Sequence, residues 1–115
     1  MDDRLKVAVV GGRDFNDEQR LKNVLDAINP THIVSGGARG ADTLARHYAM
    51  DNRIPCKEFI PKWELFGNSA GPIRNKEIVR ASDMIVAFWD GKSRGTKSTI
   101  DIAKQYRKRL AVYNY

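Results

Sequence analysis

Strand-like and helix-like segments alternate along the whole chain, and this alternation restricts the fold more than any other feature. Short apolar runs at residues 5–10, 32–34 and 84–88 are typical of buried strands, a weaker strand pattern covers residues 54–60, and residues 110–113 form the fifth predicted strand. Between these runs, apolar residues recur at the spacing of a helix face. Such alternation is typical of a parallel sheet between two layers of helices. We therefore expect an α/β, Rossmann-like three-layer sandwich, with five mainly parallel strands in the order 3-2-1-4-5.

Local signals predict where the helices begin. Asn16 is a favourable N-cap, and Gln19 completes a capping box before the first helix. A loop over residues 61–71 should precede the third helix, because Pro72 suits a first helical turn. A second loop, over residues 89–95, should precede the last helix.

Size and composition indicate one domain that spans residues 1–115, since a chain of this length buries enough surface to fold without a disulfide or a metal. The single cysteine excludes an internal disulfide and suits a reducing compartment. No secretory signal or membrane-spanning run is found, so we expect a cytoplasmic protein with no membrane partner. Because little sequence remains after the fifth strand to cover exposed helix surface, we also expect a homodimer.

Three glycine-bearing loops follow the first, second and fourth predicted strands. They read GGRDF (11–15), SGGARGAD (35–42) and WDGKSRGT (89–96). In an open parallel sheet, ligands sit beyond the carboxyl ends of the strands, where the strand order reverses. Glycines let backbone N–H groups approach a ligand, and a helix N-terminus favours negative charge. The three loops therefore predict a phosphate-binding crevice at one edge of the sheet.

The predicted ligand-binding residues are glycines that expose backbone N–H groups, arginines that suit a phosphate, and polar or aromatic neighbours. They are Gly11, Gly12, Arg13, Ser35, Gly36, Gly37, Arg39, Gly40, Asp42, Arg74, Asn75, Trp89, Ser93, Gly95 and Thr96.

Several of these residues also allow a structural interpretation. Asp42 either serves only as a favourable carboxylate in the first turn of a helix, or accepts hydrogen bonds from a ribose or holds Arg39. Trp89 either stacks on a base or packs at the edge of the core. Ser93 or Thr96 would cap the last helix, which is compatible with phosphate binding at the same place.

Three more predictions concern residues in or near the first and third of the expected helices. Arg13 either grips a phosphate or carboxylate of a ligand, or forms a surface turn with Asp14 in which Asp14 stabilises the following helix. Arg74 falls in the first turn of its predicted helix, against the helix dipole, and this misfit indicates that it contacts a ligand phosphate or an acidic neighbour. Trp63 and Phe66 either cover the crevice or pack their loop onto the core.

Charge alone does not choose the partner. The net charge of +6 favours anionic ligands, which include nucleotides and nucleic acids. The basic cluster at residues 104–109 lies where cations suit the end of a helix, so nucleic acid is the less favoured partner. His32 and His47 lack companions at metal-ligand spacing, and we expect no metal and no required cofactor.

Four motifs in this order, GGRDF, SGGARGAD, AGPIRNK (70–76) and FWDGKSRGT (88–96), resemble the YspA/cpYpsA-related branch of the SLOG superfamily. The resemblance covers essentially the whole chain and implies a Rossmann-like fold and a nucleotide or nucleotide-derived ligand. The superfamily also includes LOG-type phosphoribohydrolases and DprA DNA-processing proteins. By position, the resemblance points to Gly11, Arg13, Gly36, Gly37, Arg39, Asp42, Arg74, Asn75, Ser93, Gly95 and Thr96.

The chain departs from the LOG enzymes in the last loop. Those enzymes carry PGGxGTxxE, with a catalytic glutamate, whereas Thr99 stands at that position here. We therefore predict binding of a phosphate-bearing nucleotide derivative, by a sensor or sequestering protein. One alternative is a hydrolase that acts on an N-glycosidic or phosphoester bond, with Asp90 or Asp42 as the base. The other alternative is a DNA-binding accessory protein.

Overall fold

The computed structural model describes residues 4–115, and its centre is one five-stranded sheet. Every neighbouring pair of strands is parallel, and the strand order is β3-β2-β1-β4-β5, which confirms the expected Rossmann-like α/β fold. The strands are β1 (Lys6–Gly11), β2 (His32–Ser35), β3 (Cys56–Glu58), β4 (Met84–Trp89) and β5 (Arg109–Asn114).

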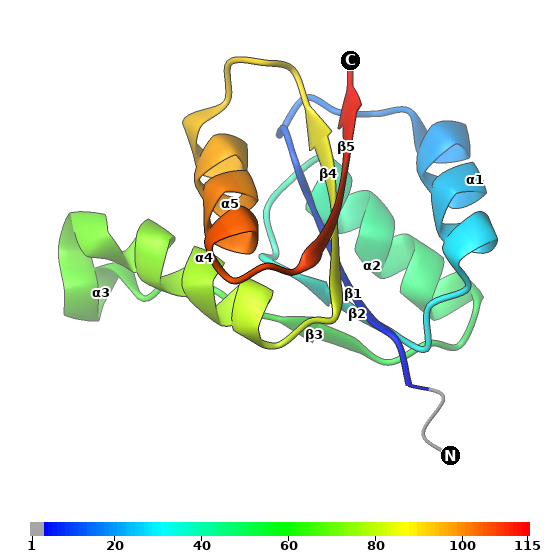
Figure 1. Cartoon of the computed structure of the whole chain (residues 1–115), viewed down its shortest axis with the longest axis horizontal. Coiled ribbons are helices and arrows are strands. Elements are labelled where there is room, and N and C mark those ends of the chain that lie inside the picture. The colour runs from blue at the N-terminus through cyan, green and yellow to red at the C-terminus, as the bar shows by residue number, and fades with distance from the viewer. Residues whose placement is uncertain (1–3) are drawn as a thin grey trace.

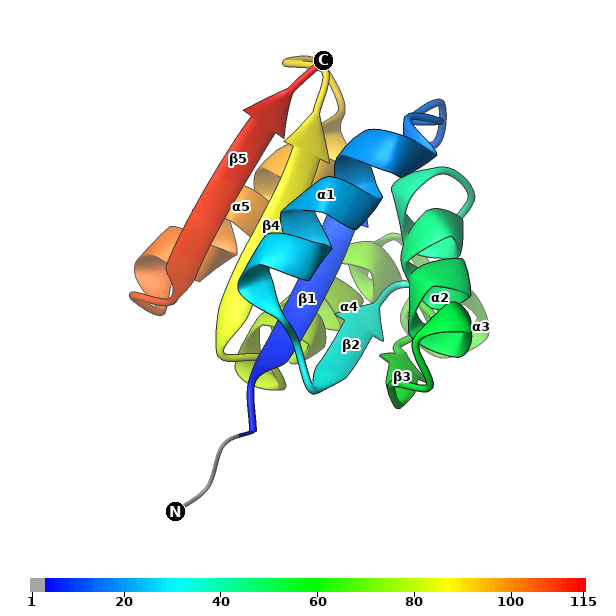
Figure 2. The same cartoon turned by 90° about the vertical axis from the view of Figure 1, so that its right-hand side faces the viewer.

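Helices cover both faces of the sheet. Figure 1 shows the sheet between two helix layers, and Figure 2 shows α1 and α2 in front of it with α4 and α5 behind. The helical segments are α1 (Glu18–Ile28), α2 (Ala41–Asp51), the short α3 (Trp63–Phe66) and 3-10 helix η1 (Gly67–Ser69), α4 (Ala70–Arg80) and α5 (Arg94–Gln105).

Alternation along β1 divides the hydrophobic core into two parts. Val7 and Val9 pack with Leu21 and Leu25 of α1 on one face of the sheet. Ala8 and Val10 pack on the opposite face, with apolar residues of α4 and α5. Successive side chains of a strand point to opposite faces, so an apolar strand buried on both sides holds the two layers together.

The first helix begins one residue later than expected. Asp17, rather than Asn16, is the N-cap of α1, and its Oδ1 accepts a hydrogen bond from the Arg20 N–H at 3.1 Å. Gln19 bonds to Asn23 on the helix surface at 2.8 Å and does not complete a capping box. Asp and Asn are both good N-caps, so residue preference does not distinguish these two neighbours. The path of the chain into the helix decides which of them is the N-cap.

The expected loop over residues 61–71 is wrong, because α3, η1 and the first residues of α4 occupy it. Arg74 therefore lies in the second turn of α4, and the dipole misfit inferred for it does not exist. Strand β3 is shorter than the predicted 54–60, since the Ile54 N–H bonds to Ala49 of α2 instead of to the sheet. Helix α5 begins at Arg94, before the expected end of its loop at residue 95.

The strand order reverses between β1 and β4. The chain leaves β1 toward α1 on one face, and it leaves β4 toward α5 on the other face. The two loops therefore diverge above neighbouring strands, which is the position where doubly wound folds bind ligands. Within residues 4–115, no helix has the length and apolar character needed to cross a membrane.

Candidate functional site

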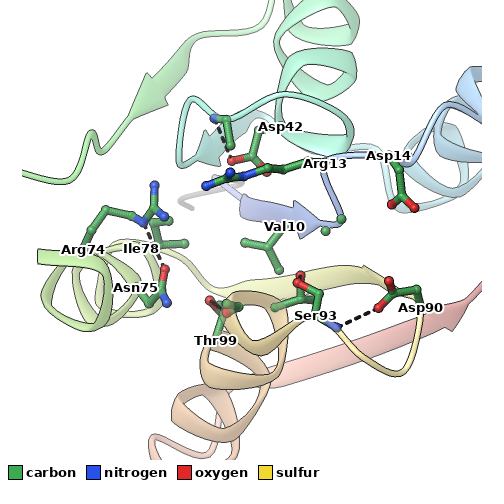
Figure 3. Close-up of a pocket in the computed structure, with 15 residues that line it drawn as sticks. Val10, Arg13, Asp14, Asp42, Arg74, Asn75, Ile78, Asp90, Ser93 and Thr99 are labelled. Carbon is green, nitrogen blue, oxygen red and sulfur yellow. Dashed lines mark hydrogen bonds between the residues drawn. The ribbon is translucent and has the colours of Figure 1, made fainter. Parts of the chain in front are cut away.

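A cleft of about 450 Å³ opens beyond the carboxyl ends of β1 and β4 (Figure 3). The loops after β1, β2 and β4 form its rim together with residues of α4 and α5. Its lining residues are Val10, Gly11, Gly12, Arg13, Asp14, Ala38, Asp42, Arg74, Asn75, Ile78, Asp90, Ser93, Gly95, Thr96 and Thr99.

Most of the predicted ligand-binding residues meet in this cleft. They are Gly11, Gly12, Arg13, Asp42, Arg74, Asn75, Ser93, Gly95 and Thr96, with Asp90 beside them. The residues that sequence reasoning did not assign to the ligand are Val10, Asp14, Ala38, Ile78 and Thr99. Val10 and Ile78 follow strand and helix periodicity like ordinary core residues, so their sequence pattern holds no signal for a site. Thr99 is one helical turn beyond Gly95, and that spacing alone marks it for the same face of α5.

Some predicted residues lie outside the cleft. Ser35 is fully buried, and its hydroxyl has no hydrogen-bond partner within residues 4–115. Gly40 has a φ of 78° and packs so closely on the Gly12 and Arg13 carbonyl groups that a side chain would not fit. Trp89 donates its indole N–H to the Ser93 carbonyl oxygen at 3.0 Å, so the structure does not bring its ring to the cleft. The remaining three, Gly36, Gly37 and Arg39, border an adjoining groove.

The first turn of α5 presents uncommitted backbone donors to the cleft. Ser93 is the N-cap, but its hydroxyl lies 3.2 Å from the Thr96 hydroxyl and does not cap the helix. The first helical hydrogen bond runs from Lys97 N–H to the Ser93 carbonyl. The N–H groups of Gly95 and Thr96 have no partner in the described chain. Free N–H groups and the helix dipole make this end of α5 attractive to an anion.

Asp90 stabilises the loop before α5. Its Oδ1 accepts hydrogen bonds from the N–H groups of Lys92 and Ser93, both at 2.8 Å. These bonds, first the one from Ser93, lower the pKa of Asp90. A carboxylate with a lowered pKa is a weaker general base, so the loop contacts explain Asp90 better than proton abstraction does.

Asp42 is a buried carboxylate at the start of α2. Its Oδ2 accepts hydrogen bonds from the N–H groups of Gly36 and Ala38, both at 3.1 Å, and so fixes the loop after β2. Burial raises the pKa of Asp42 to about 6, against the opposing effects of these bonds and of the Arg74 charge. Asp42 therefore holds its own loop and not Arg39, which makes no hydrogen bond or ion pair within residues 4–115.

Arg74 joins α4 to the same loop. Its Nη1 donates to the Gly36 carbonyl oxygen at 2.8 Å, and its Nε donates to the Asn75 side chain at 2.9 Å. Gly36 thus lies between two side chains. Its N–H donates to the Asp42 carboxylate, and its carbonyl oxygen accepts a hydrogen bond from Arg74. A Cβ at Gly36 would collide with the Arg74 guanidinium. Burial lowers the pKa of Arg74, and the charge of Arg13 adds to this effect.

Arg13 is the uncommitted arginine of the cleft. It is exposed and forms no hydrogen bond or ion pair within the described chain, and its side chain extends across the cleft toward Asp42 and Arg74 (Figure 3). The expected turn at Arg13 and Asp14 exists, closed by a bond from Phe15 N–H to the Gly12 carbonyl. Asp14 accepts a 2.6 Å hydrogen bond from the Tyr115 hydroxyl, which leaves Arg13 without its neighbour as a partner.

The cleft therefore has two kinds of donor without an acceptor in the part of the chain that the structure describes, the Arg13 guanidinium and the α5 N–H groups. Carboxylates at Asp14 and Asp90 lie at the opposite end from Arg74 (Figure 3). No group of three or more His, Cys, Asp or Glu residues that would hold a metal ion is found within residues 4–115.

Comparison with known proteins gives one family. A family model described as the YspA, cpYpsA-related SLOG family matches residues 5–66, which include the loops after β1 and β2. Gene 61 protein of Mycobacterium phage D29 is 35% identical over 103 residues, covering 80% of this chain and 82% of that protein.

Two solved structures of DNA processing protein A share the fold. The Streptococcus pneumoniae protein superposes with a TM-score of 0.79 at 22% identity, over 95% of this chain and 50% of that one. The Helicobacter pylori protein, which has a unique single-stranded DNA binding mode, gives a TM-score of 0.75 at 25% identity. The match covers 94% of this chain and 64% of the Helicobacter pylori chain, so this chain spans less than two thirds of either relative.

Proposed function

Because the chain belongs to the YspA/cpYpsA-related SLOG family, we propose that it binds a nucleotide or nucleotide-derived small molecule in the cleft beyond the carboxyl ends of β1 and β4. One observation carries this proposal: the uncommitted Arg13 guanidinium and the free N–H groups of α5 border the same cleft. Both kinds of donor suit a phosphate. A volume of about 450 Å³ is also within the usual range of small-molecule sites.

The rest of the cleft offers hydroxyl groups, carboxylates and apolar surface to such a ligand. The hydroxyl groups of Ser93 and Thr96 border the first turn of α5 and reach a phosphate or a sugar. Carboxylates accept hydrogen bonds from ribose hydroxyl and base amino groups. Asp14 and Asp90 would therefore contact the ribose or the base of the ligand. Val10 and Ile78 supply apolar surface to the lining of the cleft. A protein that binds without turnover would act as a sensor or would sequester the ligand.

Isothermal titration with nucleoside monophosphates, diphosphates and nucleotide sugars tests the proposal. Arg13→Ala should weaken the binding of a ligand found in this panel by about 10- to 150-fold, the value of one hydrogen bond to a charged group. The melting temperature should stay unchanged, because Arg13 is exposed and bonds to no group within residues 4–115. Arg80→Ala is the matched control, since it removes an equal charge from the last turn of α4.

Two results would count against the proposal. One is a folded wild-type protein that binds no member of the panel. The other is an equal loss of affinity in the Arg13 and Arg80 variants, which would indicate attraction by net charge alone.

Binding of single-stranded DNA is the second candidate, favoured by the likeness to the Helicobacter pylori protein and by the net charge of +6. Fluorescence anisotropy with a labelled oligonucleotide at increasing salt distinguishes it. Affinity that falls steeply with salt, and that mononucleotides do not compete away, would favour DNA as the ligand.

Hydrolysis is a third candidate, because the buried Asp42 has a raised pKa and lines the cleft. Incubation with nucleoside monophosphates, followed by chromatography of released base or phosphate, tests this activity. If the wild type shows turnover, and Asp42→Asn abolishes it while ligand binding persists, the cleft is an active site.

A further inference from the structure

A second hollow of about 280 Å³, here called the side groove, adjoins the cleft next to α3. Arg39, Ile60 and Trp63 border the side groove alone, whereas Arg13 and Arg74 border both the side groove and the cleft. The two hollows therefore adjoin at these shared arginines. The side groove is smaller than the roughly 300 Å³ at which small-molecule sites begin, so it suits one part of a larger ligand.

The charge of the side groove differs from that of the cleft. Three carboxylates line the cleft, whereas the residues that line the side groove include three arginines and no acidic residue. The nearest acidic side chain of β3 is Glu58, whose Oε2 lies 3.4 Å from the position of a Cβ on Gly37. Glu58 offsets part of the charge but does not line the groove, so the surface that a ligand would contact is basic. This surface is complementary to a phosphate located between Arg13, Arg39 and Arg74.

An exposed aromatic ring stands on the outer wall of the side groove. Trp63 is 55% exposed and Ile60 is 59% exposed, although large apolar side chains are usually covered. The interpretation that Trp63 and Phe66 pack their loop onto the core is therefore wrong. The Trp63 ring rests near Gly71 of α4, where its Cη2 is 3.6 Å from a Cβ position. The α3 segment projects from the body of the protein (Figure 1) and leaves the ring accessible.

An accessible indole next to a basic groove suits a nucleotide, because any base can stack on an aromatic ring and the sugar joins that base to a phosphate. We propose that the side groove binds the second nucleoside of a dinucleotide, with its base on Trp63 and its linking phosphates between Arg13, Arg39 and Arg74. This inference rests on the proposed function, because the first nucleoside would occupy the cleft. The ligand class is then two nucleosides joined through phosphates, rather than a mononucleotide.

Tryptophan fluorescence tests the proposal directly. The chain has two tryptophans, so Trp89→Phe leaves Trp63 as the only one. This protein would be titrated with AMP, ADP and diadenosine pyrophosphate, with fluorescence and calorimetry read in parallel. Diadenosine pyrophosphate should quench Trp63 and bind about 5- to 150-fold more tightly than AMP, which is the value of stacking one base.

Substitutions in α3 locate the effect. In the chain with Trp89 intact, Trp63→Ala should reduce the affinity for diadenosine pyrophosphate to the level for AMP and leave AMP binding unchanged. Leu65→Ala is the matched control, since Leu65 is also in α3 and is 72% exposed. Arg39→Ala should likewise weaken only the dinucleotide.

The outcomes separate the two proposals. If AMP binds and the dinucleotide binds no better, or if Trp63→Ala changes neither affinity, the side groove is not a nucleoside subsite and the proposed function stands. If no nucleotide binds at all, the proposed function fails and this inference fails with it. A thymidine oligonucleotide that binds more tightly than the dinucleotide and depends on Trp63 would overturn the dinucleotide in favour of nucleic acid.

Discussion

Asp42→Asn should stabilise the protein at neutral pH, although it removes a charge that accepts two hydrogen bonds. Burial raises the pKa of Asp42 from 3.8 to about 6, so the folded protein holds the proton more tightly than the unfolded chain. The contribution of this group to stability is therefore greatest below about pH 4, falls as the pH rises from about 4 to about 6, and stays low above that range.

The magnitude follows from the same two values. A pKa difference of one corresponds to about 1.4 kcal/mol, so ionising Asp42 in the folded protein reduces the free energy of unfolding by about 3 kcal/mol. The Arg74 charge opposes this loss and the Glu58 charge increases it, and both effects are contained in the raised pKa. An asparagine at this position is neutral at every pH, and its carbonyl oxygen accepts the bonds from Gly36 and Ala38.

Urea unfolding of the wild type and of Asp42→Asn at several pH values measures this effect. The advantage of the variant in free energy of unfolding should grow by about 3 kcal/mol between about pH 4 and pH 7. Changes in hydrogen-bond geometry shift this difference equally at every pH. Asp90, whose pKa is lowered, titrates in both proteins and cancels from the difference.

A difference that is constant with pH would refute the reasoning, because it would mean that Asp42 has an ordinary pKa in the folded protein. If the advantage of the variant in free energy of unfolding shrinks as the pH rises, the pKa of Asp42 is lowered on folding instead of raised. Asp42 would then be a stabilising carboxylate.

Two further substitutions test the architecture of the site. Gly36→Ala should lower the free energy of unfolding by about 1–3 kcal/mol in urea, because its methyl group displaces the Arg74 guanidinium from the Gly36 carbonyl. Gly95→Ala is the control, with no atom within 4 Å of its Cβ position, and should not destabilise the protein. Trp89→Phe should lower the free energy of unfolding by about 1 kcal/mol, because the hydrogen bond to Ser93 is lost. Its affinity for a mononucleotide, measured by calorimetry, should stay within about twofold of the wild type.

The strand order and the place of the cleft could be predicted because they depend on pattern. Buried strands that alternate with amphipathic helices restrict the topology, and topology alone brings the loops after β1, β2 and β4 to one edge. Element boundaries were harder to predict. Asn16 and Asp17 offer equal caps, and the short α3 leaves too few residues to show helical periodicity.

The direction of Trp89 illustrates a second limit. The predicted strand ends at Phe88, whereas β4 continues to Trp89. Because side chains alternate along a strand, Trp89 lies on the opposite face of the sheet from Phe88. Its ring then lies with α4 and α5 and bonds to Ser93. One residue of strand length decides the side on which an aromatic ring lies, and composition does not reveal it. The homodimer, the cytoplasmic location and the lack of a required cofactor stay predictions.

The sequence presents Arg13, Arg39 and Arg74 as three equal candidates for a phosphate, and the structure separates them. Arg74 is half-buried and bonded to Gly36, whose N–H is in turn held by Asp42, so its removal would disturb the loop as well as any ligand. Arg13 and Arg39 are exposed and bond to no protein group in the described chain. A buried carboxylate that reduces stability at neutral pH is retained most readily where it shapes a site. Loss of binding in an Arg74 variant would therefore report on the loop, and only Arg13 and Arg39 report directly on the charge that meets the ligand.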